Sequence, residues 1–348
     1  MPAATATIFE KMNGGDERDQ TILDALLAAP AAAFASGSVL ARELGISRPA
    51  LAARISRLQE RGVPIARMRG HGYRIEWPAV SGFHGELIAA LLRADGAVCS
   101  WRFREEVDST NSEAERLLAA GEPPPLAVTA RRQTAGRGRL GRRWESHRAE
   151  NLYLTLAWRP WLPPARLQTF TLWMGLKACR HLRKQFGIPV MVKWPNDLQI
   201  EGRKLAGMLT EARIDADRTR DLIFGLGLNL AGDFTDFPPE VRARATNLSE
   251  HLEAPLDLNR AASGMITALL DAAAHFFAEP TSATLTAHWP EVDALEGREV
   301  VAHSGSEVLR GRAAGIDEMG CLRLVLSGSE GERRLHAGEV TLAPAHPA

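Results

Sequence analysis

The 348-residue chain has few cysteines and no excess charge of either sign. Its three cysteines, Cys99, Cys179 and Cys321, are an odd number spread over a long chain, which excludes a disulfide-stabilised scaffold and fits a reducing cytosol. They also lack the spacing of metal ligands. Lysine plus arginine (42) balance aspartate plus glutamate (42), so no global field attracts nucleic acid or an anionic membrane. Any such partner must be bound by a local patch.

The sequence also lacks a recognisable targeting or membrane-spanning segment. Its first 20 residues turn acidic where a signal peptide needs a basic start followed by an apolar run. Elsewhere, charged residues interrupt the apolar stretches within about 18 residues. We therefore expect a cytoplasmic protein without membrane association, and the length favours two or three domains of roughly 150 residues each.

The N-terminal residues have the pattern of a winged helix-turn-helix. Apolar residues at helical spacing predict helices over 21–29, 38–44 and 48–62. Gly45 separates the second helix from the third, which is typical of helix-turn-helix units. The segment that follows alternates apolar and polar residues around Gly70-His71-Gly72, which predicts a β-hairpin, the wing.

The middle of the chain predicts an α+β domain. A linker helix is expected over 78–93, and a second helix begins near Ser109, where Thr110 and Glu113 have the spacing of a capping box. Strand-like runs interleaved with one long helical pattern then favour a largely antiparallel mixed sheet. The strands are expected at 126–130, 151–158, 190–193, 205–211 and 222–230, and the helix at 165–186.

The C-terminal part predicts a small β-barrel. Helical patterns at 259–278 and 282–289 precede short strands over 299–344, which glycines interrupt at intervals. The fold class is therefore α+β in three domains. Their expected bounds are 18–78 for the winged helix, 79–295 for the central domain and 296–348 for the barrel.

The segment 131–146 carries the densest signal for a binding site. Glycines let a backbone approach a ligand closely, and the guanidinium fork of arginine matches carboxylate or phosphate oxygens. The pattern predicts an anion-binding loop, with a solvated arginine-rich surface loop as the alternative. The residues are Arg131, Arg132, Arg137, Arg139, Arg142 and Arg143, interleaved with Gly136, Gly138 and Gly141.

The same glycines match the literal G-x-G-x-x-G pattern of dinucleotide-binding sites. That pattern requires a strand before it and a helix immediately after it. Here the segment after the glycines has Leu152, Leu154 and Leu156 at alternate positions, which predicts a strand instead of a helix. The context therefore disfavours a nicotinamide or flavin site.

Three further segments hold candidate site residues. Asp197, at the end of a predicted strand, is a candidate Mg²⁺ ligand, although an Asn-Asp turn is the alternative. Lys204 opens an apolar segment where its ammonium can face a buried anion, although a lone lysine there is usually solvent-facing. Asn229 ends a glycine-rich strand, which is equally consistent with a turn.

Taken together, the motifs resemble those of biotin protein ligases. The N-terminal SVLARELGISRPAL and GHGYRI are similar to the bifunctional members that also act as biotin-operon repressors, and the resemblance covers nearly the whole chain. The matching blocks, in the family's order, are VDSTN (107–111), QTAGRGRLGRRW (133–144), NLYLT (151–155), KWPNDL (193–198), RKLAGMLTE (203–211) and GLGLN (225–229).

The resemblance implies an activity and a set of site residues. Biotin and ATP would be the substrates, with Mg²⁺, and biotinyl-5'-AMP the intermediate from which biotin passes to a lysine of a biotin carboxyl carrier protein. Lys204, Arg137 and Arg139 would be catalytic, and Asp197 would bind the metal. The residues that would bind biotin or nucleotide are Ser109, Thr110, Asn111, Gln133, Gly136, Arg137, Gly138, Arg139, Trp144, Lys193, Asn196, Lys204, Gly207 and Asn229.

The resemblance also implies binding to the operator DNA of biotin genes, by a homodimer that forms when the adenylate is bound. Seven arginines against one glutamate between residues 48 and 74 would suit phosphate contacts. The DNA-binding residues would be Arg48, Arg54, Arg57, Arg69 and His71.

Two departures from the family pattern bear on these roles. Ala52 and Ala53 stand where related repressors often carry polar or basic residues, so a winged helix that no longer binds DNA is one alternative. Ala343 stands where the family often has an arginine that reaches the nucleotide from the barrel.

Two other functions compete with a biotin ligase. A lipoate ligase is disfavoured by the GRGRLGRRW and KWPNDL blocks. A DNA-binding sensor without turnover would not need Lys204, Asp197 and the arginine loop.

Overall fold

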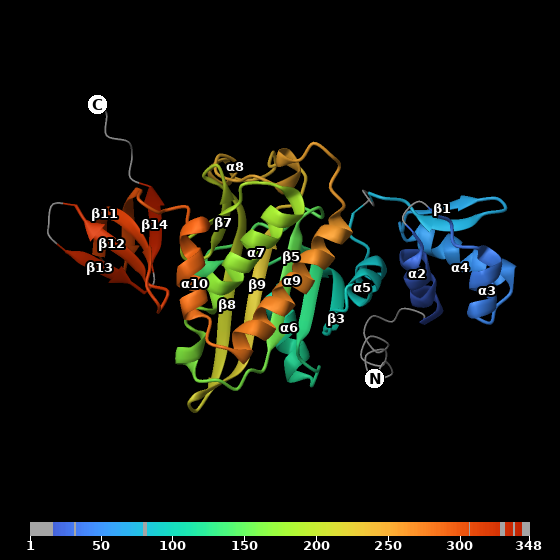
Figure 1. Cartoon of the computed structure of the whole chain (residues 1–348), viewed down its shortest axis with the longest axis horizontal. Coiled ribbons are helices and arrows are strands. Elements are labelled where there is room, and N and C mark those ends of the chain that lie inside the picture. The colour runs from blue at the N-terminus through green and yellow to red at the C-terminus, as the bar shows by residue number, and fades with distance from the viewer. Residues whose placement is uncertain are drawn as a thin grey trace.

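The chain folds into three bodies that follow one another along the long axis of the molecule (Figure 1). They are an N-terminal helical domain, a central sheet covered by helices, and a C-terminal antiparallel sheet. The structure is a computed structural model, and it describes residues 17–30, 33–78, 82–305, 307–327, 331–336 and 338–342. Ala343 lies outside the described residues.

The N-terminal domain is a winged helix, as predicted. Its buried side chains form a core of their own, which includes Leu23, Leu51 and Ile55. Ser47 precedes the third helix, and its hydroxyl accepts from the backbone N–H of Ala50, which satisfies one otherwise unpaired donor. The elements are α2 (Glu17–Ala28), α3 (Gly37–Glu43), α4 (Arg48–Glu60), β1 (Ile65–Met68) and β2 (Gly72–Ile75).

The expected linker helix is α5 (Gly85–Ala94), and it is an integral part of both neighbouring domains. Leu87 and Leu91 belong to the winged-helix core, whereas Ile88 and Leu92 belong to the central core. Residues at this spacing lie on different faces of one helix, so each face completes one core. The predicted boundary at residue 78 precedes this helix, and the helix contributes to the cores of the domains on both sides of it.

The central domain is built on a seven-stranded sheet in the order β3-β4-β5-β9-β8-β7-β6. Only β3 and β4 are parallel, which confirms the largely antiparallel sheet. The strands are β3 (Ser100–Val107), β4 (Leu126–Gln133), β5 (Leu152–Trp158), β6 (Met191–Lys193), β7 (Asp197–Ile200), β8 (Arg203–Asp215) and β9 (Arg218–Leu228). The sequence patterns missed β3 and β7.

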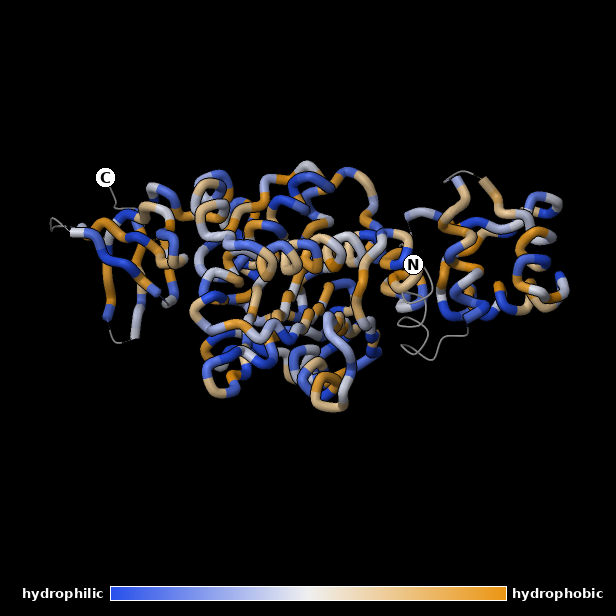
Figure 2. Tube along the Cα trace, turned by 60° about the horizontal axis from the view of Figure 1, so that its bottom comes forward, coloured by the Kyte–Doolittle hydropathy of each residue, from blue (hydrophilic) through white to orange (hydrophobic). Residues whose placement is uncertain are grey.

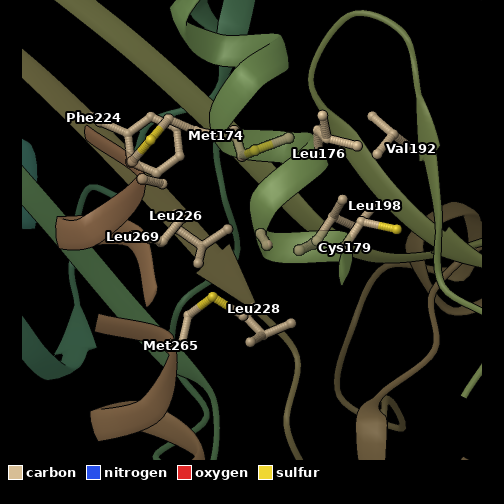
Figure 3. Packing of buried hydrophobic residues seen from close by; sticks show 14 of the residues in the cluster. Met174, Leu176, Cys179, Val192, Leu198, Phe224, Leu226, Leu228, Met265 and Leu269 are labelled. Carbon is tan, nitrogen blue, oxygen red and sulfur yellow. The ribbon is translucent and has the colours of Figure 1, made fainter. Parts of the chain in front are cut away.

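The two faces of this sheet are covered unequally. Helices α7 (Phe170–Phe186) and α9 (Leu258–Ala278) pack on one face, where Met174 and Met265 contact the apolar side chains of β9 (Figures 1 and 3). Among the described residues, the helix that covers the other face is α6 (Thr110–Ala119), whose Ala114 and Leu118 pack against Ile223. The part of this second face beyond the N-terminus of α6 is left for the cavity described below.

Two local predictions were wrong. The long helix begins at Phe170 rather than at residue 165, because a separate turn, η2 (Pro164–Leu167), precedes it. The capping box near Thr110 does not form: Ser109 precedes the helix without a side-chain cap. The Glu113 carboxylate instead pairs with Arg104 and Arg116.

Helix α9 is the one helix of the described residues that is long and apolar enough to cross a membrane, with 21 residues. In the structure, 56% of its most apolar 18-residue window is buried inside the protein. Met265, Ile266 and Leu269 belong to the central core, so packing against α7 and the sheet accounts for the apolar composition.

The C-terminal strands form an antiparallel sheet in the order β13-β12-β11-β10-β14. Within the described residues no ladder joins β13 to β14, so the expected barrel is seen there as an open sheet. Its strands carry both hydrophobic and hydrophilic stretches (Figure 2). The strands are β10 (Glu299–Ser304), β11 (Glu307–Ile316), β12 (Leu322–Leu326), β13 (Glu332–Leu335) and β14 (Glu339–Leu342). The short elements before them are η1 (Arg139–Gly141), α8 (Pro239–Arg242), η3 (Leu248–His251), α10 (Ser282–His288) and η4 (Trp289–Glu291).

Candidate active site

A cavity of about 1010 Å³, its open mouth included, lies on the partly covered face of the central sheet. Nearly all the residues predicted to bind biotin, nucleotide or metal line it, although they come from four separate motif blocks of the chain. Those that do are Ser109, Thr110, Asn111, Gln133, Arg137, Gly138, Arg139, Trp144, Lys193, Asn196, Asp197, Lys204 and Gly207.

Glycines on β8 and β9 form the floor of the cavity, and the indole of Trp144 lies on them. Gly207 and Gly227 face each other in the ladder between these strands. A Cβ at Gly227 would lie 2.3 Å from the Trp144 ring, and one at Gly207 would lie 2.7 Å from it. The glycines of the two motifs are therefore needed so that an aromatic ring can lie directly against the sheet.

One end of the cavity is a buried polar network. The Gln133 side-chain carbonyl accepts from the backbone N–H of Thr110 at 2.8 Å, and the Gln133 amide donates to the Ser146 hydroxyl. The hydroxyl of Thr155, fully buried on β5, donates to Asn111 Oδ1 at 2.6 Å. Fixed donors and acceptors of this kind suit a small polar group of a ligand.

The opposite end gathers cations around one carboxylate. Lys204 Nζ lies 2.8 Å from Asp197 Oδ1 and 5.3 Å from the centre of the Trp144 ring. Lys193 also lines the cavity, and burial lowers the pKa of its ammonium group. Two ammonium groups against one carboxylate leave this end ready to bind an anion.

Asn229 and Gly136, both predicted as ligand-binding residues, do not line the cavity. Asn229 is buried and donates to the carbonyl oxygen of Thr246 at 3.0 Å. It thereby fixes the segment that pairs with the backbone of Lys204. A Cβ at Gly136 would lie 2.5 Å from the carbonyl oxygen of Trp144, so this glycine allows the loop to fold back on itself.

The arginine loop crosses the mouth of the cavity with three side chains held by different parts of the protein. Arg137 lies 3.0 Å from Glu211 Oε2 of β8. The Arg139 guanidinium donates to Asn196 Oδ1 at 3.2 Å, and Arg142 donates to Glu339 of β14 at 2.8 Å. This placement favours the anion-binding loop over a merely solvated one.

Burial and pairing shift the pKa values of two loop arginines in opposite directions, and the hydrogen bond to Glu339 raises the pKa of Arg142. Burial lowers the pKa of Arg139, although a guanidinium remains charged at neutral pH. The hydrogen bond from Arg142 holds the pKa of Glu339 below its usual value. Arg137 and Arg142 each pair with a carboxylate, whereas Arg139 donates to an amide oxygen, so Arg139 is the one of these three that presents positive charge to the cavity.

Sequence reasoning considered the C-terminal domain only through Ala343 and missed the residues of that domain that line the cavity. Gly338, Glu339 and Val340 line the cavity, and Glu339 lies 197 positions along the chain from its partner Arg142. No local pattern signals a contact over that separation. Thr155 and Glu211 were also missed as site residues, although both lie in motif blocks.

Around Asp197, the residues that the structure describes do not form a metal site of several protein ligands. The described residues contain no group of three or more histidine, cysteine, aspartate or glutamate side chains that would hold a metal ion. Mg²⁺ is usually bound by one or two carboxylates together with phosphate oxygens and water. Asp197 therefore fits a Mg²⁺ ion that arrives with a nucleotide triphosphate.

The winged helix carries a separate basic groove between α4 and the hairpin. Arg48, Arg67, Arg69 and His71 line it. Arg57 is exposed on α4 outside this groove. Three of the residues predicted to bind DNA, Arg48, Arg69 and His71, therefore line one groove.

Arg54 is the exception among the predicted DNA-binding residues. Its guanidinium donates to Asp19 Oδ1 at 2.8 Å, and its side chain is only 12% exposed. Because Asp19 is itself buried, Arg54 stabilises the packing of α2 on α4 rather than facing a partner.

Comparison with known proteins identifies the family. The bifunctional ligase/repressor BirA of Escherichia coli is 32% identical over 298 residues, which cover 85% of this chain and 89% of BirA. The chain belongs to the biotin/lipoate A/B protein ligase family. The model of this family matches residues 104–229, and a helix-turn-helix domain model matches residues 18–74.

Other members of the family are similar over comparable lengths. The bifunctional ligase/repressor BirA of Bacillus subtilis is 28% identical over 317 residues, 89% of this chain and 94% of its own. The biotin–[acetyl-CoA-carboxylase] ligase of Paracoccus denitrificans is 33% identical and covers 67% of this chain and 96% of its own. The structure of the Aquifex aeolicus biotin protein ligase in complex with biotin and ATP superposes with a TM-score of 0.56, at 28% identity, over 70% of this chain and 99% of that one.

Proposed function

We propose that this chain is an ATP-dependent biotin protein ligase that forms biotinyl-5'-AMP and transfers biotin to a lysine of a biotin carboxyl carrier protein. One observation carries the proposal. A glycine floor with Trp144, a buried polar network and a cluster of cations line the same cavity, which the arginine loop crosses. The polar network would bind the ureido ring, and the cations would bind the carboxylate and phosphates.

The first half-reaction joins two anions, so the protein must reduce their repulsion. A carboxylate oxygen of biotin attacks the α-phosphorus of ATP, a carbon–oxygen–phosphorus anhydride forms, and pyrophosphate leaves. Lys204 and Arg139 are the cations best placed to stabilise the charge that develops on the α-phosphate. Mg²⁺ bound with the triphosphate near Asp197 would neutralise further phosphate charge.

The second half-reaction needs no covalent enzyme intermediate. The neutral amine of the carrier lysine attacks the acyl carbon, an amide bond forms, AMP leaves and the amine loses a proton. Burial raises the pKa of Cys99 to about 12 and that of Cys179 to about 11, so neither is a thiolate nucleophile at neutral pH. We place this reaction in the cytoplasm.

Labelled substrates separate this proposal from lipoate ligation, the other activity in the name of the family. The protein is mixed with ATP, Mg²⁺ and either biotin or lipoate, and pyrophosphate release and labelling of an apo carrier domain are followed. Release with biotin alone supports the proposal. Release with lipoate alone would assign the other activity, and release with neither would reject both.

We propose in addition that the winged helix binds operator DNA. Arginine and histidine side chains line the groove between α4 and the wing. None of the residues that line this groove lines the ligase cavity. One such unit buries too little surface for tight specific binding, so two must cooperate in a homodimer. Adenylate strengthens DNA binding only if it favours the dimer-competent state.

Removing Arg67 and Arg69 together weakens DNA binding and leaves biotinylation unchanged. If each arginine contacts one phosphate, each loss reduces the slope of log affinity against log salt by about 0.9. Titration of operator-length DNA at several salt concentrations measures this. Arg166→Ala, an exposed arginine of the central domain, is the matched control.

Affinity and salt slope equal to wild type in the double variant would make the winged helix a structural appendage. Arg54→Ala is unsuitable for this test, because it leaves buried Asp19 without one of its two arginine partners and destabilises the domain itself.

A further inference from the structure

Glu211 lies on β8 next to the cavity but does not line it. One of its carboxylate oxygens contacts two residues that line the cavity. Asn111 Nδ2 donates to Glu211 Oε2 at 2.6 Å. The guanidinium of Arg137 lies 3.0 Å from the same oxygen. Asn111 belongs to the buried polar network and Arg137 to the loop, so Glu211 connects the polar network to the loop at the mouth of the cavity.

Glu211 fixes the orientation of the Asn111 amide. An ionised carboxylate only accepts hydrogen bonds, so the amide nitrogen must face Glu211. The amide oxygen then faces the Thr155 hydroxyl at 2.6 Å. Gly225 leaves room for this arrangement, because a Cβ there would lie 2.5 Å from Asn111 Oδ1.

Glu211 also holds the loop through Arg137. The backbones of Arg137 and Arg143 pair with each other across the loop. A contact that fixes the Arg137 side chain therefore restrains the whole segment. The other nearby acid, Glu115, lies 3.7 Å from Arg137 and is 2.8 Å from Arg213. Glu211 is therefore the principal counter-ion of Arg137.

We propose that Glu211 is a positioning residue that couples recognition of biotin at Asn111 to docking of the arginine loop. It keeps the loop over the cavity before ligand binds, so that the loop loses less conformational entropy when biotin enters. The choice of biotin as ligand rests on the function proposed above. The docking of the loop does not depend on that function.

Glu211→Gln separates the two contacts. The glutamine carbonyl still accepts from Asn111, but the charge that holds Arg137 is lost. We expect deuterium uptake by the backbone amides of residues 136–144 to become several-fold faster in the ligand-free protein. We also expect the KM for biotin to rise about tenfold, the scale for losing a hydrogen bond to a charged group, while the KM for ATP and the Tm stay close to wild type.

Two comparisons make the test specific. Glu115→Gln, which removes the more distant acid, should change loop exchange and the biotin KM much less. In an Arg137→Gln background, Glu211→Gln should add little further increase in loop exchange, because the contact is already gone.

The proposal is overturned if Glu211→Gln exchanges at the wild-type rate over 136–144. It is also overturned if the KM values for biotin and ATP rise equally with a lower Tm, since that indicates only a structural role. A wild-type protein that makes no adenylate would reject the proposed function, whereas the ligand-free exchange measurement would still decide whether Glu211 docks the loop.

Discussion

Replacing Lys204 by alanine slows biotinyl-adenylate formation by about 10² to 10³-fold, the scale for losing one preorganised charge partner of a transition state. Lys204 lies between Asp197 and the Trp144 ring at the cationic end of the cavity, where the α-phosphate would react. Single-turnover pyrophosphate release with saturating biotin and ATP measures the effect directly. Because the Lys204 side chain is 39% exposed, the Tm should hardly change.

Lys184→Ala is the matched control, since Lys184 is exposed on α7 and does not line the cavity. Its adenylation rate should equal that of wild type. A Lys204→Ala variant that forms adenylate at the wild-type single-turnover rate would remove Lys204 from the mechanism.

Gly227→Ala should raise the KM for biotin by roughly 10 to 100-fold, which corresponds to about 1 to 3 kcal/mol of overpacking. The new methyl group would lie 2.3 Å from the Trp144 ring, and the strand beneath it cannot move without breaking its pairing with β8. The indole must therefore leave its place and occupy space that biotin needs. Steady-state kinetics and a biotin titration that follows tryptophan fluorescence report the two consequences.

Gly331→Ala is the control for this substitution, because a Cβ there meets nothing within 4 Å. It should leave the biotin KM unchanged. Wild-type biotin affinity in Gly227→Ala would contradict the view that the glycine floor seats Trp144 against the sheet.

Much of the fold could be predicted because its local patterns agree with its tertiary contacts. The run at 151–158 becomes β5, a central strand that is buried along its whole length, and apolar content alone predicts such a strand. The winged helix was predictable for a related reason, since helical spacing, Pro49 and the Gly70-His71-Gly72 turn all indicate the same unit.

Other elements could not be predicted because distant residues decide them. Strand β3 has four charged residues in eight, and Glu105 interrupts the apolar alternation of Trp101, Phe103 and Val107; the strand forms by parallel pairing with β4. Strand β7 has only four residues, so its segment reads as a turn until β6 and β8 pair with it. Short or charged strands of this kind depend on their neighbours more than on their own propensity.

In the candidate site, too, local motifs predicted some residues and distant contacts decided others. Short-range motifs placed Lys204, Asp197, Trp144 and the arginine loop, and the structure brings them to one cavity. The partners that fix these groups were not predictable. Glu339 reaches Arg142 from another domain, and Asn229 donates to the backbone of Thr246, in the segment that pairs with Lys204.

Retention of biotinyl-AMP by the wild-type protein is the most direct test of the proposed ligase activity. The wild-type protein is incubated with ATP, Mg²⁺ and labelled biotin, separated from free ligands by rapid gel filtration, and then mixed with an apo carrier domain. The account predicts that stoichiometric biotinyl-AMP elutes with the protein and that its label passes to a carrier lysine without further ATP. Protein that elutes without adenylate, or adenylate that cannot be transferred, would contradict the account.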